Sequence, residues 1–317
     1  MTTATVAGFT AADITAASNA AGAGGKVLFP SDAYNATGLQ NTVADQTWEL
    51  ERGAVLEKPA SANTASILTN LANGLQLRGG EIRDTLTNTT EHGVSTVGKS
   101  FSMRGTKMTD IRGWGVVGGN AALDIEDSDF RDPYHGAIYW NSTTNGVIGP
   151  RIHANRIFKT DPAKYGTHGG IHIRTAGTLW TDWNLNTIVT QNYIELPVGN
   201  IADSVGIDVW QGQAPLVWGN YVKNGRIGYS LYATQFFRLS QNQAFACHDY
   251  AYEYVACSYG THALNNGRGW GGGLNYGVSA VQETKFCKFY DSNFIGFSGY
   301  GGQDHYFSGD STPNTVR

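Results

Sequence analysis

The sequence predicts an all-β protein folded as a parallel β-solenoid, and three observations support this. The first is a short strand-like run that ends in asparagine and recurs six times. These runs are RIHAN, IVTQN, LVWGN, RLSQN, THALN and FYDSN, ending at Asn155, Asn192, Asn220, Asn242, Asn265 and Asn293. Successive asparagines are 37, 28, 22, 23 and 28 residues apart, a period typical of solenoid coils.

The second observation is that asparagine stands at the end of each run. Asparagine tolerates the left-handed backbone of a tight corner and bonds its neighbour's backbone there. Stacked coils are therefore expected to place the six side chains in one ladder. The third observation is the composition, with 41 Gly, 8 Pro, 12% aromatic and 15% charged residues. It suits a packed strand-and-turn protein and not a disordered chain.

Residues 9–21 are expected to form one helix at the start of the solenoid. Thr10 is the N-cap candidate, Asp13 occupies the third helical position, and Gly22 begins the stop. A helix here would cover the first coil, whose strand edge would otherwise pair with other chains. We divide the chain into an N-terminal arm with the capping helix at 1–24 and a β-helix domain at 25–317.

The opening segment DITAASNAAGAGGKVLFPSDAY resembles the start of pectate-lyase-like β-helix proteins. That superfamily includes polysaccharide lyases, polygalacturonase-like hydrolases and phage tailspikes. Its members usually have a Gly between the Pro and the Tyr, where this chain has Ser31, Asp32 and Ala33. The resemblance implies a single-stranded right-handed parallel β-helix that binds a polysaccharide and cleaves it. Through the tailspikes it implies a virion or extracellular location and a homotrimer or other virion proteins as partners.

A second strand accompanies each Asn corner: GAIYWN (136–141), GGIHIR (169–174), VGIDVW (205–210), IGYSLY (227–232), YAYEYV (250–255) and LNYGVS (274–279). Side chains alternate between the two faces of a strand. The apolar set is expected inside: Ile138, Ile171, Ile207, Tyr229, Tyr252 and Tyr276, then Trp140, Ile173, Val209, Leu231, Tyr254 and Val278. The other set is expected to face solvent: Tyr139, His172, Asp208, Ser230, Glu253 and Gly277, then Asn141, Arg174, Trp210, Tyr232, Val255 and Ser279.

The solvent-facing rows predict a glycan-binding strip, because coils stack only about 4.8 Å apart. Trp and Tyr rings suit the CH face of a sugar, and carboxylates and Arg suit hydroxyl and uronate groups. Loop insertions at 158–168 and 175–186 could wall the strip with Lys164, Tyr165, His168, Trp180, Asp182 and Trp183. The substrate-binding candidates are Trp210, Tyr232, Asn141, Trp180 and Trp183. The alternative is a solvated sheet face with scattered aromatics.

Two catalytic chemistries fit the strip, and both stay open. An inverting hydrolase would use Asp208 and Glu253, two coils or about 9–10 Å apart. A lyase would use His172, Arg174 and Tyr139 as base, cationic stabiliser and acid. The alternative to an enzyme is a non-catalytic receptor-binding or decoration protein of a virion.

No cofactor is expected, with calcium as a minor alternative. The segment LDIEDSDFRD carries Asp124, Glu126, Asp127, Asp129 and Asp132. Calcium needs several such oxygens, but the spacing is not an EF-hand loop and strand alternation divides these carboxylates between two faces.

Charge and cysteine usage restrict the partners further. The net charge is −4 without a basic stripe, so nucleic acid and anionic membrane are not expected as partners. The sequence has no stretch of about 18 apolar residues, so no segment is expected to span a bilayer. The N-terminus lacks the pattern of a secretory signal. Cys247, Cys257 and Cys287 are expected to fill coil interiors.

Overall fold

The structure is a computed structural model that describes residues 1–59, 65–84, 92–159, 161, 168–175, 183–198, 204–269, 276–281, 284, 287–290, 292–295, 305–307 and 315–316. The chain forms two compact units, the first including Met1–Trp140 and the second Asn141–Pro162 and Thr167–Arg317. The boundary falls within one strand, β14. The two units are called unit 1 and unit 2 below, and the prediction of one continuous β-helix domain at 25–317 stays a prediction.

Unit 1 consists of one helix and a series of short strands. They are α1 (Ala11–Ala21), β1 (Thr3–Thr5), β2 (Lys26–Phe29), β3 (Ala33–Asn35), β4 (Leu39–Asn41), β5 (Thr47–Lys58), β6 (Leu68–Asn70), β7 (Leu75–Asp84), β8 (Val94–Val97), β9 (Phe101–Arg104), β10 (Lys107–Thr109), β11 (Trp114–Gly119), β12 (Leu123–Glu126), β13 (Asp129–Arg131) and most of β14 (Gly136–Ser142).

The described part of unit 2 is built from strands alone. They are β15 (Val147–Ile148), β16 (Arg151–His153), β17 (Arg156–Phe158), β18 (Ile171–Thr175), β19 (Asn184–Leu185), β20 (Ile188–Thr190), β21 (Tyr193–Glu195), β22 (Val205–Trp210), β23 (Gly212–Gln213), β24 (Leu216–Trp218), β25 (Tyr221–Lys223), β26 (Ile227–Tyr232), β27 (Arg238–Ser240), β28 (Gln243–Cys247), β29 (Tyr250–Val255), β30 (Thr261–Ala263), β31 (Asn266–Gly269), β32 (Tyr276–Val281), β33 (Lys288–Tyr290), β34 (Asn293–Ile295), β35 (His305–Phe307) and β36 (Thr315–Val316).

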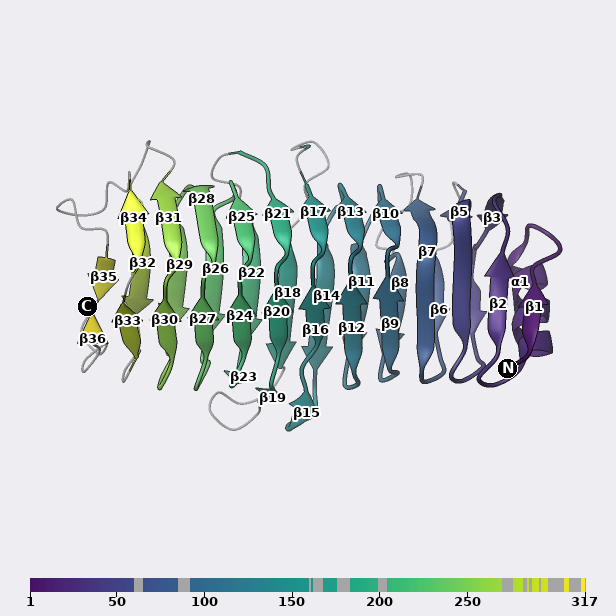
Figure 1. The fold of residues 1–317 in the computed structure, drawn as a ribbon, viewed down its shortest axis with the longest axis horizontal. Coiled ribbons are helices and arrows are strands. Elements are labelled where there is room, and N and C mark those ends of the chain that lie inside the picture. Colours follow the sequence, from purple (N-terminus) through teal and green to yellow (C-terminus); the bar gives the residue numbers. More distant parts are fainter. Residues whose placement is uncertain are drawn as a thin grey trace. The chain divides into compact units, whose positions relative to one another are not determined.

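Each strand pairs in parallel with the equivalent strand of the next coil, so the strands of successive coils lie side by side (Figure 1). In unit 2, β22 pairs with β26, β24 with β27, and β25 with β28. In unit 1, β7 pairs with β9 and β10, which pair with β12 and β13. The fold is therefore the expected right-handed parallel β-helix with a short N-terminal capping helix.

The helix α1 begins and ends as its sequence predicts. The Thr10 hydroxyl accepts a bond from the Asp13 backbone N–H, and the Asp13 carboxylate accepts one from the Thr10 backbone, which completes a capping box. At the other end the buried Gln46 amide donates to the carbonyls of Ser18 and Gly22, the groups a helix C-terminus leaves without partners. The arm preceding the helix adds strand β1, whose backbone pairs with β2.

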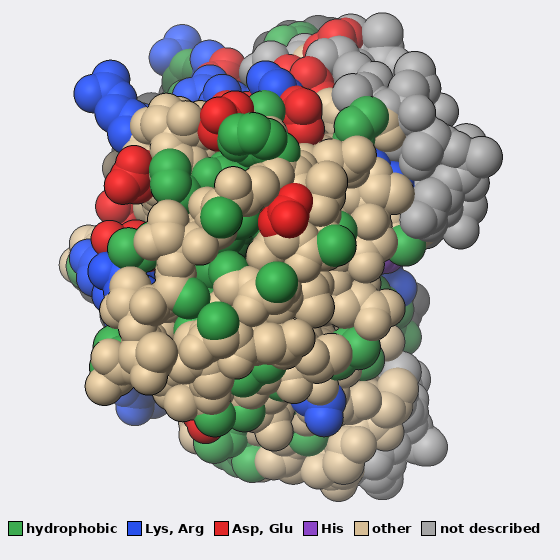
Figure 2. All heavy atoms as spheres, turned by 90° about the vertical axis from the view of Figure 1, so that its right-hand side faces the viewer, with side chains coloured by type: hydrophobic (Ala, Val, Ile, Leu, Met, Phe, Trp, Pro, Cys, Tyr) green, Lys and Arg blue, Asp and Glu red, His purple; other side chains and the backbone are tan. Residues whose placement is uncertain are grey.

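The face around α1 shows apolar side chains scattered among polar and backbone atoms (Figure 2). On the helix, the small side chains of Ala12 and Ala20 are exposed, while Ile14 and Ala17 are buried. The helix thus covers the first coil with a face that carries no large apolar side chain of its own.

The asparagine ladder of unit 2 forms as predicted along five of its six expected positions. Each side chain's Nδ2 donates to the Oδ1 of the next, at 3.0 Å from Asn155 to Asn192, 2.9 Å to Asn220, 3.0 Å to Asn242 and 3.1 Å to Asn265. All five are buried. The same Oδ1 atoms also accept the backbone N–H of the preceding ladder residue, at 2.9–3.0 Å, so the ladder satisfies polar groups that would be costly to bury alone.

Two details of the ladder prediction were wrong. The left-handed backbone falls on the residue before each asparagine, for example Ala154 at φ 54° and Leu264 at φ 55°, and not on the asparagine itself. Asn293 is also one residue beyond the ladder, because it pairs with Asn266. Ser292 takes the ladder position, and its hydroxyl accepts the Asn265 backbone N–H at 3.2 Å.

The core lies where the apolar alternation predicts it. Within the described coils the inward residues are almost completely buried: Ile138, Trp140, Ile171, Ile173, Ile207, Val209, Tyr229, Leu231, Tyr252 and Tyr254. The register of the last predicted strand was wrong by two residues, because Tyr252 pairs with Val278 and not with Tyr276, and Glu253 with Ser279 and not with Gly277. The three cysteines are buried, as expected, and they form no disulfide among the described residues.

Candidate functional site

One side of the strand row β18, β22, β26 and β29 in unit 2 gathers most of the predicted site residues. His172 pairs with Asp208, Asp208 with Ser230, and Ser230 with Glu253, one residue per coil. Trp210 pairs with Tyr232 in the adjacent row. The polar patch, as we call it below, consists of His172, Arg174, Asp208, Trp210, Ser230, Tyr232 and Glu253.

The Asp208 carboxylate is held at both oxygens. His172 Nδ1 lies 2.9 Å from Oδ2, and Trp210 Nε1 donates to Oδ1 at 2.7 Å. Both His172 and Asp208 side chains are only 6% exposed. Because a carboxylate only accepts hydrogen bonds, Nδ1 of His172 carries its proton toward Asp208 and Nε2 becomes the basic nitrogen.

Two rings and a guanidinium cover this pair. The Arg174 guanidinium lies over the Trp210 ring, 3.9 Å from its centroid, and the Trp210 and Tyr232 rings are 4.8 Å apart. Nε of Arg174 is buried without a hydrogen-bond partner among the described residues. Stacking on an indole fixes the cation in place, next to a basic imidazole.

Glu253, two coils from Asp208, has a different environment. Burial raises the pKa of its carboxyl above the ordinary value; the hydrogen bond from the Ser230 hydroxyl at 3.1 Å opposes the rise and the Asp208 charge adds to it. The patch therefore combines a carboxylate held by two donors with a carboxyl whose pKa burial raises, and such differing environments are typical of acid–base sites.

The burial of the patch corrects one expectation. His172, Asp208 and Ser230 do lie opposite the core residues, but they are buried and not solvent-facing. The physical reason is that the Trp210 side chain extends along its own strand to bond Asp208, and the Arg174 guanidinium lies on the Trp210 ring. Side-chain alternation gives the face of a strand but not the depth to which neighbours cover it.

The remaining predicted site residues are not part of this arrangement. Tyr139 belongs to unit 1, where its ring stacks on Trp114 with centroids 5.0 Å apart. Asn141 is half-buried, and its Oδ1 has no hydrogen-bond partner among the described residues. The Trp183 backbone N–H donates to Asn145 Oδ1 at 2.9 Å. Trp180 lies outside the described residues, as do Lys164, Tyr165 and Asp182 of the same predicted loop wall.

Sequence reasoning missed an ionic group beside Glu253. Arg226 Nε and His248 Nδ1 both contact Asp249, at 2.5 and 2.6 Å, and Arg226 also lowers the pKa of Glu253. His168, which was expected only in the loop that walls the strip, lies beside His172, with ring centroids 4.9 Å apart. The pair His248–Asp249 directly before strand β29 was the available signal, since Arg226 occupies the same corner one coil earlier.

No metal site is apparent among the described residues, where no three His, Cys, Asp or Glu side chains are grouped to hold an ion. In the acidic segment, Asp129 contacts Arg131 at 2.8 Å and Glu126 contacts Arg104 at 3.8 Å. Calcium binding stays a prediction, and no step below uses a metal.

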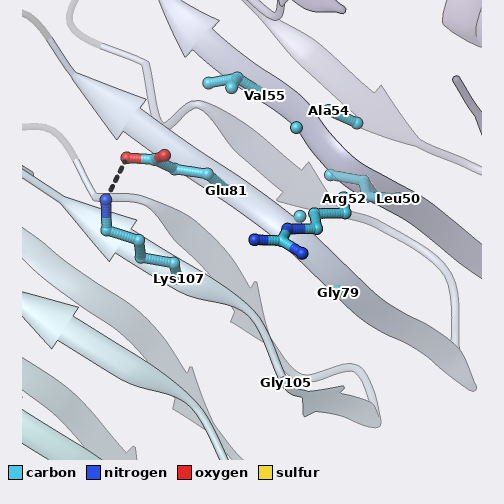
Figure 3. Close-up of a pocket in the computed structure, with 10 residues that line it drawn as sticks. Leu50, Arg52, Ala54, Val55, Gly79, Glu81, Gly105 and Lys107 are labelled. Carbon is cyan, nitrogen blue, oxygen red and sulfur yellow. Dashed lines mark hydrogen bonds and ion pairs between the residues drawn. The ribbon is translucent and has the colours of Figure 1, made fainter. Parts of the chain in front are cut away.

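A separate cavity of about 400 Å³ lies in unit 1 (Figure 3). It is lined by Leu50, Arg52, Gly53, Ala54, Val55, Gly79, Gly80, Glu81, Gly105 and Lys107. Its lining includes one partly exposed ion pair, Lys107 Nζ to Glu81 Oε1 at 3.2 Å. Such pairs contribute little, and the lining holds no imidazole or second carboxylate, so the polar patch is the better candidate for chemistry.

Comparison with known proteins identifies the fold of the chain. No family model matches the chain, and no curated protein does either. Solved structures with similar coordinates show that the chain has a right-handed parallel β-helix fold.

Two of these structures are particular enzymes. One is the catalytic unit of a thermostable GH87 α-1,3-glucanase from Streptomyces thermodiastaticus strain HF3-3, 13% identical over 98% of this chain and 67% of that chain, with a TM-score of 0.61. The other is the A-module of the mannuronan C-5 epimerase AlgE4 from Azotobacter vinelandii, 13% identical over 96% of this chain and 95% of that chain, with a TM-score of 0.56. Identities this low establish the fold alone. No helix among the described residues is long and apolar enough to cross a membrane. A virion setting and a homotrimer stay predictions.

Proposed function

We propose that this protein is a polysaccharide-active enzyme that cleaves its substrate by proton abstraction at the polar patch, a lyase-type reaction. The observation that carries the proposal is the His172–Asp208 pair, 2.9 Å apart and nearly buried, beside a guanidinium held on the Trp210 ring. An imidazole oriented by a carboxylate is a common general base, and a fixed cation stabilises the charge that develops on a uronate when its α-proton leaves.

The reaction would use the residues as follows. Nε2 of His172 takes the proton from the carbon next to the uronate carboxylate. Arg174 stabilises the resulting enolate, whose electrons form a carbon–carbon double bond as the glycosidic C–O bond breaks. The leaving oxygen takes the proton from the imidazolium, and Asp208 stabilises that imidazolium while it exists. Trp210 and Tyr232 would supply the apolar surface for the sugar.

Hydrolysis is the second candidate, and the raised pKa of Glu253 favours it. In that case Glu253 would donate a proton to the leaving oxygen and Asp208 would activate water, with the two carboxyls about 9–10 Å apart across two coils. We rank it second because both Asp208 oxygens already accept hydrogen bonds from His172 and Trp210. The similar structures include a protein named a glucanase and one named a C-5 epimerase, so they support action on polysaccharides without choosing between the two reactions.

The test is a product assay on uronic-acid and neutral polysaccharides, reading ultraviolet absorbance of unsaturated products and reducing ends in parallel. A lyase gives both signals, and His172→Ala should abolish them. A hydrolase gives reducing ends without absorbance, and Glu253→Gln should abolish them.

Matched controls separate chemistry from folding. His153→Ala removes a half-buried imidazole that bonds Thr190 elsewhere in unit 2, and Glu57→Gln removes a carboxylate paired with Arg83 in unit 1. Both should leave activity unchanged. A wild-type protein that binds polysaccharide but releases no product in either assay would refute the enzyme proposal and support a non-catalytic glycan-binding β-helix.

A further inference from the structure

The strand row β21, β25, β28 and β31 of unit 2, separate from the strands of the polar patch, carries a groove of about 180 Å³. Its lining, which we call the aromatic groove, consists of Tyr221, Gln243, Ala244, Phe245, Asn266, Gly267 and Arg268. None of these residues takes part in the chemistry described above. We propose that the aromatic groove is a second, non-catalytic binding site for a pyranose-containing saccharide chain.

The register sets the groove across successive coils. Tyr193 pairs with Tyr221, Tyr221 with Gln243, and Gln243 with Asn266. In the neighbouring row Lys223 pairs with Phe245 and Phe245 with Arg268. The residues between these rows, Val222, Ala244 and Gly267, are buried, so both rows point outward and the groove runs along the stack, as an extended chain would.

A bulge borders the groove. Ala244 and Gly267 occupy inward-facing positions, so only their backbone lies between the two outward rows at the floor of the groove. The pairing of β28 with β31 shifts between Phe245 and Cys247, and Ala246 there has φ 56°. A bulge of this kind bends a strand and re-aims its side chains, which sets Phe245 at the edge of the groove.

A half-buried group of rings supports the ring that lines the groove, Tyr221. Tyr193 stacks on one face of Tyr221, with an interplanar angle of 3° and centroids 5.2 Å apart, and the Phe158 ring is tilted by 38° against Tyr193, with centroids 5.4 Å apart. These contacts hold Tyr221 in a fixed position on a rigid sheet, and a fixed apolar ring suits the CH groups of a pyranose.

The polar groups suit sugar hydroxyls. Gln243 and Asn266 are exposed and offer both donors and acceptors. Glu195 is already neutralised by Lys223 at 2.7 Å, while Arg268, 5.4 Å from the Phe245 centroid, has no carboxylate partner among the described residues. The groove thus joins rings, amides and one available cation, and Arg268 should favour an acidic sugar over a neutral one.

The experiment uses the full chain carrying His172→Ala, so that bound saccharide is not turned over. A panel of neutral and acidic oligosaccharides is screened for binding, and the best one is titrated calorimetrically. Adding Tyr221→Ala should weaken binding about tenfold, the effect of losing one stacking ring, and Gln243→Ala, an exposed change with little effect on folding, should weaken it in the same direction. The matched control is Phe236→Ala, which removes a 49% exposed ring stacked on Tyr259 outside the groove and should leave binding unchanged.

The outcomes separate this site from the polar patch. Binding that survives Trp210→Ala but falls with Tyr221→Ala and Gln243→Ala supports the groove, whether or not the wild-type protein releases product. The inference would be overturned by any of three results: binding that is lost only with Trp210→Ala, binding by the groove variants equal to that of the His172→Ala parent, or no binding to any saccharide of the panel.

Discussion

Removing one side chain from the middle of the asparagine ladder should destabilise unit 2 strongly. The Asn220 side chain takes part in four hydrogen bonds: it donates to the Val189 carbonyl at 2.8 Å and to Asn242 Oδ1 at 3.0 Å, and it accepts from Asn192 N and Nδ2 at 3.0 and 2.9 Å. At about 1 kcal/mol for each bond, Asn220→Ala should lower the free energy of unfolding by about 4 kcal/mol.

Urea unfolding followed by circular dichroism measures this loss as a lower midpoint with an unchanged slope. Asn220→Ser should lose roughly half as much, because a hydroxyl can still accept one backbone N–H, as Ser292 does at the end of the ladder. Asn266→Ala, an exposed asparagine next to the ladder, is the control and should change stability by less than about 0.5 kcal/mol. Equal midpoints for the Asn220→Ala and Asn266→Ala proteins would refute the reasoning.

Four further predictions concern packing, pH (two of them) and thiol reactivity. Ile207→Ala, at a site with 0% exposure, should cost about 2–5 kcal/mol in the same urea assay, and a smaller loss would show that the coil collapses around the gap. Burial and the nearby His135 lower the pKa of His92 from 6.5 to about 4, so on acidification the unfolded chain binds the proton before the folded protein does. The free energy of unfolding should therefore fall as the pH drops from 6.5 to about 4, and this fall should be smaller in the His92→Gln protein. The raised pKa of Glu253 has the opposite effect on stability. Its contribution to the free energy of unfolding is present below pH 4.5 and is lost as the pH rises through the higher pKa of the folded protein, so Glu253→Gln should flatten that part of the plot of stability against pH. The three buried cysteines, whose pKa values burial raises, should react with a thiol reagent only after unfolding, and fast reaction of the native protein would contradict their placement.

Strands β22, β26 and β29 could be predicted with their observed bounds, because alternation and the turn residues beside them are local signals. The slip at β32 has an equally local cause. Its residues Tyr276 and Val278 are both apolar and two positions apart, and a shift of two residues keeps every side chain on the same face. Alternation alone therefore cannot distinguish the two registers.

For the candidate site, the sequence predicted which residues share a face but not how they contact one another. That His172 and Asp208 neighbour each other followed from the coil repeat, whereas the bond from Trp210 that buries them depends on side-chain conformation. The left-handed residues before each ladder position were unpredictable for another reason. Ala154, Gln191 and Leu264 carry no glycine-like signature, and tertiary contacts impose that conformation on them.

The asparagine ladder aligns successive coils whatever the number of residues in each coil. Asn155 and Asn192 are 37 residues apart and Asn220 and Asn242 only 22, yet the same Nδ2-to-Oδ1 bond of 3.0 Å joins each pair. Residues added between ladder positions need not disturb the stacking, and doubling a flexible loop costs only about 0.6 kcal/mol. The scaffold can therefore acquire or lose whole loops in evolution, or accept grafted ones in the laboratory, while the side chains of the polar patch keep their places.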